Sequence, residues 1–135
     1  MRKAFSSNWL SSKQKRKQIK YRANAPLHKK HKFLSAHLSK MLREKYSRRS
    51  LPLRKGDEVI VMRGAFKKRK EKVSSIDLKR LRVNLENLQR SKKDGTKVNV
   101  HFSPSVLQIQ SLNLEDKERI QALNRKQKEN ASNKK

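Results

Sequence analysis

Residues 54–64 read Arg54-Lys55-Gly56-Asp57-Glu58-Val59-Ile60-Val61-Met62-Arg63-Gly64, and the architecture expected for the whole chain follows from this run. Val59 and Val61 alternate with Glu58, Ile60 and Met62, and this period of two predicts a strand with one packed face. Gly56-Asp57 before the strand and Arg63-Gly64 after it are turn signals. Strand periodicity, turn residues and dense positive charge coincide here and nowhere else in the sequence.

The residues after this run predict further short strands and then a helix. Strand patterns fall at about 58–62, 72–76, 81–86, 88–90, 98–101 and 106–112. Asp94-Gly95 between two strand-like segments predicts a hairpin, and Asp77–Arg80 predicts a tight link. Short strands with tight links in about sixty residues predict a mainly β fold, a small barrel. Residues 113–128 predict a C-terminal helix, and 129–135 are expected to be a disordered tail.

Residues 1–50 form a basic arm, in which 16 Lys and Arg face a single acid, Glu44. Helices are predicted at Ser11–Ala23, Pro26–Phe33 and Ser35–Tyr46, the last carrying one apolar stripe. The members of that stripe are Leu34, Leu38, Met41, Leu42 and Tyr46. The arm is too polar to offset its own ordering entropy, so we expect it to become ordered on a partner.

The composition points to a polyanionic partner. The chain of 135 residues has 38 Lys and Arg against 11 Asp and Glu, a net charge of +27. Such self-repulsion opposes compaction unless a polyanion neutralises it, and nucleic acid is favoured over an anionic membrane surface. The sequence has no Cys, which excludes disulfides and thiolate chemistry. No apolar run is long enough to span a bilayer or to act as a secretory signal, so an intracellular protein is expected.

Several stretches resemble a known family. Lys55–Gly64 resembles the opening of a KOW motif, an SH3-like barrel element of ribosomal proteins and transcription elongation factors. The flanking segments resemble the eukaryotic and archaeal form of large-subunit ribosomal protein twenty-four, called twenty-six in older eukaryotic naming. Those segments are Asn24–His28, Leu38–Tyr46, Arg49–Lys55, the Asp94-Gly95 hairpin and His101–Val106. The chain departs from the family after Gly64, where Lys68 and Glu71 stand in a loop usually richer in glycine.

The resemblance implies an SH3-like KOW barrel at 51–112, between the arm at 1–50 and a helix and tail at 113–135. It also implies a structural protein of the large ribosomal subunit that binds the 5′ region of the large rRNA. By the same resemblance it acts early in assembly and sits near the mouth of the peptide exit tunnel. The expected partners are rRNA and neighbouring ribosomal proteins, in one copy per cytoplasmic ribosome, with assembly in the nucleolus if the source is eukaryotic. No cofactor, metal, membrane or small-molecule substrate is expected.

The residues predicted to bind RNA are cations and histidines that would replace counterions around phosphates. In the arm they are Lys13, Lys15, Arg16, Lys17, Lys20, Arg22, His28, Lys29, Lys30, His31 and Lys32. At the junction and in the loop after Gly64 they are Arg48, Arg49, Arg54, Lys55, Arg63, Lys67, Lys68, Arg69 and Lys70. For any one of them the alternative is a merely solvated charge. Arg119, Arg125 and Lys126 are assigned to a solvated or rim face.

Other readings of individual residues stay open. Phe5, Trp9 and Tyr21 either stack on bases or dock on the protein itself, and docking is favoured for Tyr21. His28 and His31 are three residues apart, but they lack nearby Cys or carboxylate partners for a metal site. A KOW module of a transcription elongation factor is the second hypothesis for the whole chain. An enzyme is the third, and it is disfavoured because the acids are scattered; Asp57-Glu58 is expected to shape a turn.

Overall fold

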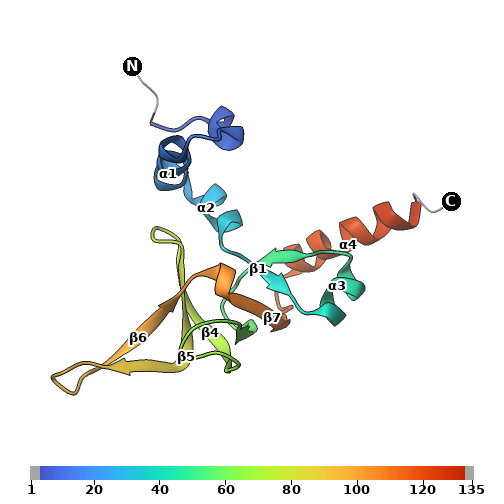
Figure 1. Ribbon diagram of the computed structural model, residues 1–135. Helices are drawn as coiled ribbons and strands as arrows, with labels where there is room; N and C mark the ends of the chain where they lie inside the picture. The colour runs from blue at the N-terminus through green and yellow to red at the C-terminus, as the bar shows by residue number, and fades with distance from the viewer. Residues whose placement is uncertain (1–3, 133–135) are drawn as a thin grey trace.

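The computed structural model describes residues 4–132, with side chains described through residue 124. Seven strands form one sheet in the order β2-β1-β7-β3-β4-β5-β6, antiparallel at every pairing except that of β1 with β7 (Figure 1). The strands are β1 Ser35–Leu38, β2 Ser50–Pro52, β3 Glu58–Val61, β4 Lys70–Asp77, β5 Arg82–Ser91, β6 Lys97–Phe102 and β7 Leu107–Ser111. The predicted class, a mainly β, small barrel-like fold with a C-terminal helix, is confirmed.

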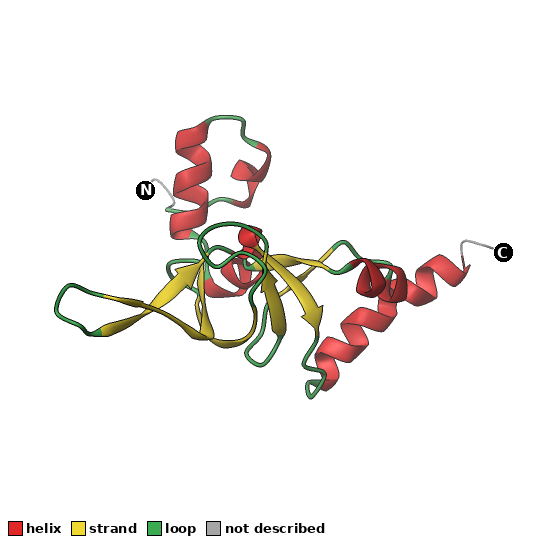
Figure 2. Cartoon of the chain, turned by 60° about the horizontal axis from the view of Figure 1, so that its bottom comes forward, coloured by secondary structure: helices red, strands yellow, loops and turns green. Residues whose placement is uncertain are grey.

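Three extensions leave the body of the sheet (Figures 1 and 2). The N-terminal helices stand away from it, the β5–β6 hairpin projects to one side, and α4 projects to the other. The helices are η1 Ser7–Ser11, α1 Lys15–Asn24, α2 Leu27–Phe33, α3 Lys40–Tyr46, η2 Pro104–Val106 and α4 Lys117–Ser132. The molecule therefore offers far more surface than a compact barrel of the same length.

The core follows the alternation read in residues 58–62. Val59 and Val61 of β3 are fully buried, while Glu58 and Ile60 are only partly covered. They join Leu107 and Ile109 of β7, their antiparallel neighbour, in one apolar cluster. Burial of such side chains contributes about 1.5–3 kcal/mol each, and this cluster is the main source of stability. The same cluster contains residues of the arm, namely Leu34, Ala36, Leu38 and Tyr46.

The helix predicted over Ser35–Tyr46 is wrong in its first third. Ser35–Leu38 is strand β1, which pairs with β2 on one side and β7 on the other. Ala36 and Leu38 are buried and alternate with partly exposed Ser35 and His37. Backbone pairing with β7 outweighs the weak helical preference of this segment. The helix starts only at Lys40, and Met41 is 81% exposed, so Met41 does not belong to the predicted apolar stripe.

Other boundaries differ by smaller amounts. The predicted segments 81–86 and 88–90 are parts of one strand, β5, whose register with β6 shifts between Asn84 and Gln89. The C-terminal helix begins at Lys117 rather than at residue 113, and it continues to Ser132. The stretch expected as a disordered tail is thus helical over 129–132, and its residues 133–135 lie outside the described part of the chain.

Two predicted turns are confirmed. Asp94-Gly95 closes the β5–β6 hairpin, with Gly95 at φ +80° and the Lys92 N–H donating to the Thr96 carbonyl over 2.9 Å. Asp77 accepts N–H groups of Lys79 and Arg80 between β4 and β5, and this lowers the pKa of its carboxyl. In the β3–β4 loop Lys68 adopts φ +70°, a left-handed conformation that glycine adopts at lower cost. This is the loop in which the chain departs from the glycine-rich family pattern.

Candidate nucleic-acid interface

The N-terminal arm is built around an aromatic cluster of its own. Tyr21 of α1 is only 5% exposed and lies between two rings, 5.0 Å from Phe5 and 5.7 Å from Phe33 between centroids. The Gln18 amide donates to the carbonyls of Trp9 (3.0 Å) and Ser12 (2.7 Å), which ties η1 to α1. The arm, expected to become ordered on a partner, therefore has apolar and hydrogen-bond contacts of its own.

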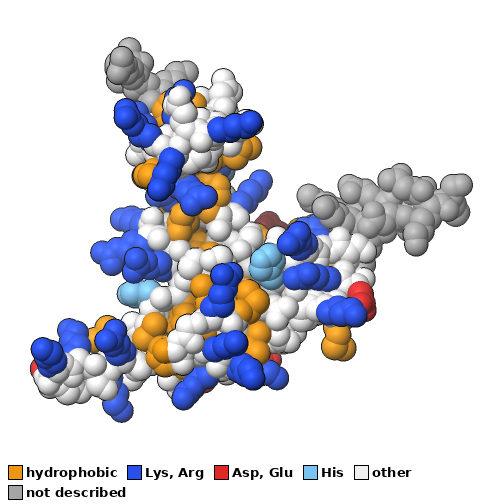
Figure 3. Space-filling model, viewed as in Figure 1, with side chains coloured by type: hydrophobic (Ala, Val, Ile, Leu, Met, Phe, Trp, Pro, Cys, Tyr) orange, Lys and Arg blue, Asp and Glu red, His pale blue; other side chains and the backbone are white. Residues whose placement is uncertain are grey.

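Most of the predicted RNA-binding side chains of the arm face solvent. Exposed are Lys13, Lys15, Arg16, Lys17, Lys20, Arg22, His28 and Lys32. Two others contact the protein itself. Lys29 Nζ lies 4.8 Å from the Phe5 ring centroid, and Lys30 is only 9% exposed. Figure 3 shows Lys and Arg side chains over this arm from top to base. The α1–α2 surface thus presents a dense set of cations on a shaped support.

The predicted cations of the β3–β4 loop and of the first position of β4 are also exposed, namely Arg63, Lys67, Lys68, Arg69 and Lys70. The loop is anchored by Phe66, whose ring meets Phe102 edge-on at 5.9 Å. Phe66 is therefore partly buried and packs against the core. Anchoring one residue fixes the loop while leaving its charges in solvent.

The junction residues do not form a free cationic surface. Arg54 pairs with Asp116, and the Arg48 guanidinium donates to the Ala122 carbonyl of α4. Arg49 and Lys55, by contrast, are exposed. Two of the four predicted junction contacts thus already hold the C-terminal segment against the sheet.

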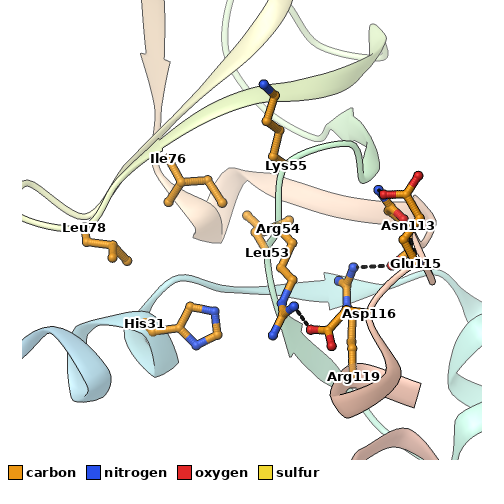
Figure 4. A pocket seen from close by; sticks show the side chains of 10 residues that line it. All are labelled: His31, Leu53, Arg54, Lys55, Ile76, Leu78, Asn113, Glu115, Asp116 and Arg119. Atoms are coloured by element: carbon orange, nitrogen blue, oxygen red, sulfur yellow. Dashed lines mark hydrogen bonds and ion pairs between the residues drawn. The ribbon is translucent and has the colours of Figure 1, made fainter. Parts of the chain in front are cut away.

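A hollow of about 380 Å³ lies at this junction, with His31, Arg54 and Arg119 around an apolar wall formed by Ile76 and Leu78 (Figure 4). Burial lowers the pKa of His31, and the charges of Arg54 and Arg119 lower it further. His31 is therefore mainly neutral near pH 7, and it does not add a cation to the predicted set.

The assignment of Arg119 to a solvated or rim face is wrong. Arg119 is 5% exposed and forms a two-pronged ion pair with fully buried Asp57, at 2.6 and 2.7 Å. Asp57 also accepts the N–H groups of Arg54 (2.8 Å) and Asn113 (3.0 Å). The pair joins the turn before β3 to α4. One signal was present in the sequence, because Arg119 lies four residues before Leu123 and so shares its buried face. Arg125 and Lys126 lie outside the described side chains.

The predicted set of residues omits a second group of exposed cations. Arg90, Lys92, Lys93 and Lys97 surround the tip of the β5–β6 hairpin, which projects from the sheet in Figure 1. The acid at this tip, Asp94, is occupied by the Thr96 hydroxyl and N–H, which lower the pKa of its carboxyl. The Asp94-Gly95 turn signal predicts the hairpin, and the cations on both sides of it are the sequence signal for its charge.

The described residues hold no group of three or more His, Cys, Asp or Glu side chains arranged to bind a metal ion. No helix among them is long and apolar enough to cross a membrane. The fold and its charge thus define a class, small and strongly basic β proteins with cationic extensions.

Comparison with known proteins identifies the family within that class. Residues 12–126 match the family of ribosomal proteins L26 (eukaryotic) and L24p (archaeal), and the chain belongs to it. It is 47% identical over 115 residues to the large ribosomal subunit protein uL24 of Methanosphaera stadtmanae, covering 85% of this chain and 98% of that protein. The uL24 protein of Korarchaeum cryptofilum is 46% identical over 110 residues, covering 82% and 84%. The family is one of ribosomal proteins, which are structural components and not enzymes.

Proposed function

We propose that this protein is a structural constituent of the large ribosomal subunit that binds rRNA. The observation that carries the proposal is the extent of the family match, residues 12–126, which takes in the arm and the barrel together. A KOW module of a transcription elongation factor has no reason to share the arm. By resemblance to the family, the RNA bound is the 5′ region of the large rRNA. The site is near the mouth of the exit tunnel, where the protein supports assembly beside neighbouring ribosomal proteins.

The mechanism is electrostatic. Lys and Arg of the arm and the β3–β4 loop displace counterions from phosphates, and counterion release drives binding. RNA shape supplies specificity, because the deep major groove of an RNA helix hides base edges from side chains. The aromatic cluster around Tyr21 favours this electrostatic mechanism. An arm that is packed before binding loses less conformational entropy when it associates with RNA.

Sedimentation of a cell lysate through a sucrose gradient tests the proposal. The protein is followed by mass spectrometry, and the gradient is repeated after a high-salt wash. Comigration with the large subunit through the wash is the expected result. Absence from the large-subunit peak would overturn the ribosomal assignment and favour the transcription-factor reading. Loss on washing would indicate an associated factor in place of a core constituent.

A further inference from the structure

A second hollow, of about 450 Å³, lies where the arm meets the sheet. Hydroxyl, imidazole and guanidinium groups line it, from Arg22, Ser35, His37, Ser50, Ser103 and Ser105. Phe33 and Leu81 add an apolar wall. Pro104 is the ninth residue of the lining, and of the nine only Arg22 belongs to the cations predicted to bind RNA.

The strand geometry explains why these groups converge. Ser35 and His37 alternate with buried Ala36 and Leu38, so both project from the outer face of β1. Ser50 stands directly opposite His37 in the β1–β2 ladder. Directly opposite residues of an antiparallel pair lie on the same face, which brings the Ser50 hydroxyl beside the imidazole.

Residues 103–105, at the start of η2, form another side of the hollow. Pro104 is buried at the sheet, and this places Ser103 and Ser105 on either side of it at the surface. Their hydroxyl oxygens lie 3.0 Å apart. One hydroxyl can donate to the other, which leaves the second free to donate to a ligand.

Hydrogen-bonding capacity in the hollow is largely unused. His37 Nδ1 is buried and has no hydrogen-bond partner among the described residues. No side-chain hydrogen bond to another described residue occupies the Ser50 hydroxyl. The Ser35 hydroxyl donates to the Lys32 carbonyl over 2.7 Å, but its oxygen can still accept. Buried polar groups in folded proteins are rarely left without a hydrogen-bond partner. The unpaired His37 Nδ1 at the edge of a polar hollow therefore indicates a ligand.

The charge defines the class of ligand. Arg22 is the one charged side chain among the described residues that line the hollow, and none of them is acidic. A single guanidinium among neutral donors suits a group with one negative charge, such as a phosphodiester. Hydroxyls that both donate and accept suit the ribose 2′-hydroxyl, which distinguishes RNA from DNA.

We propose that this hollow binds one nucleotide of RNA, with Arg22 on the phosphate and the serine hydroxyls and His37 on the ribose 2′-hydroxyl. The proposal rests on the proposed function, since it names a subsite of the same RNA interface. It adds a residue-level means of selecting RNA over DNA, which the exposed cations of the arm alone do not supply.

Fluorescence anisotropy of the full chain with labelled rU6 and dU6 at one fixed salt concentration tests the ribose contact. Wild-type protein is expected to prefer rU6. Ser103→Ala/Ser105→Ala should weaken rU6 binding by about threefold to tenfold, the cost of one or two hydrogen bonds, and leave dU6 binding unchanged. The control is Ser91→Ala/Ser111→Ala, two exposed serines outside the hollow, which should change neither affinity.

A second pair of variants tests the phosphate contact. Arg22→Gln and Arg16→Gln remove the same charge from the same helix, and both side chains are exposed. Arg22→Gln should weaken the binding of both oligonucleotides at least about threefold more than Arg16→Gln does. A charge-assisted hydrogen bond to a phosphate is stronger than the long-range attraction of an exposed charge.

The outcomes separate the two proposals. Equal affinity of wild-type protein for rU6 and dU6, or an equal loss on both from the serine pair, would overturn the ribose assignment and leave ribosomal sedimentation untouched. No binding of either oligonucleotide would overturn this inference, while the proposed function would still be decided by the sedimentation test. Indistinguishable effects of Arg22→Gln and Arg16→Gln would overturn the phosphate contact.

Discussion

Arg119 is buried, and its removal should strongly destabilise the protein. Its guanidinium neutralises Asp57, which is fully buried. Replacing one member of a buried pair leaves an uncompensated charge, at a cost of about 3–5 kcal/mol. We expect Arg119→Met to lower the free energy of unfolding by that amount, measured by urea denaturation. Arg80→Met, at an exposed turn position, should change it by less than about 0.5 kcal/mol. Equal losses in the two variants would show that Asp57 does not depend on Arg119.

Gly56 and Gly64 flank β3 and allow a matched comparison. Both have positive φ, +84° and +96°, so alanine at either position costs about 1–2 kcal/mol of backbone strain. At Gly56 a Cβ would also lie 2.8 Å from Asn113 Nδ2, whereas at Gly64 it would meet nothing within 4 Å. Gly56→Ala should therefore destabilise by about 1 kcal/mol more than Gly64→Ala in thermal unfolding. The reverse order would contradict the close approach of Asn113 to this turn.

His31 predicts how stability varies with pH. Its pKa is lowered in the folded chain, so the unfolded chain binds the proton more readily below about pH 6.5. The contribution of neutral His31 to stability is then fully present above that pH. It is lost as the pH decreases through the pKa of His31 in the unfolded chain towards its pKa in the folded chain. We expect the wild-type Tm to decrease between about pH 7.5 and 5.5, and His31→Gln to reduce that decrease. His28→Gln, an exposed histidine on the same helix, is the control and should leave it unchanged.

At the scale of elements, the N-terminal helices η1, α1 and α2 should open without the sheet. Tyr21 joins α1 to α2 through Phe33 and to the segment before η1 through Phe5. We expect Tyr21→Ala to speed amide hydrogen exchange in α1 by about tenfold or more while β3 and β7 keep their protection. Ile19→Ala on the same helix removes a side chain that is 60% exposed, and it should leave exchange nearly unchanged. Loss of protection in β3 as well would mean that these helices and the sheet unfold as one unit.

The sequence predicted elements where pattern and turn residues agreed, and it failed where long-range contacts decided the outcome. Val59 and Val61 alternate clearly between glycine turns, and β3 lies there. The segment SAHL also alternates, but it precedes a helical pattern, and its pairing with β2 and with β7, the latter about seventy residues away, makes it a strand.

At the candidate RNA interface too, local sequence predicts some features, and contacts between distant segments determine the others. Exposure of the α1 cations follows from an almost wholly polar helix. The roles of Arg48, Arg54 and Arg119 depend on how α4 returns to the sheet, and charge alone does not contain that information. The hollow lined by Ser35, Ser50, Ser103 and Ser105 joins segments that look unremarkable when read separately.

At the scale of the whole molecule, charge is distributed between two extensions that lie apart in Figure 1. The arm carries exposed lysines on α1, and the β5–β6 hairpin carries exposed lysines at its tip. If all surface charge acted only as a uniform field, removal of three lysines from either place would have the same effect on RNA binding. If the arm forms the RNA interface, the two places differ.

Salt titration of binding to a transcript of the 5′ region of a large rRNA distinguishes these cases. Lys15→Gln/Lys17→Gln/Lys20→Gln on α1 removes three phosphate contacts, so the slope of log K against log salt should decrease by about 2–3, at about 0.7–0.9 per contact. Lys92→Gln/Lys93→Gln/Lys97→Gln at the hairpin removes the same charge and should change the slope by less than about 0.5. Equal changes would show that the hairpin shares the RNA interface, and a larger change from the hairpin would move the interface away from the arm.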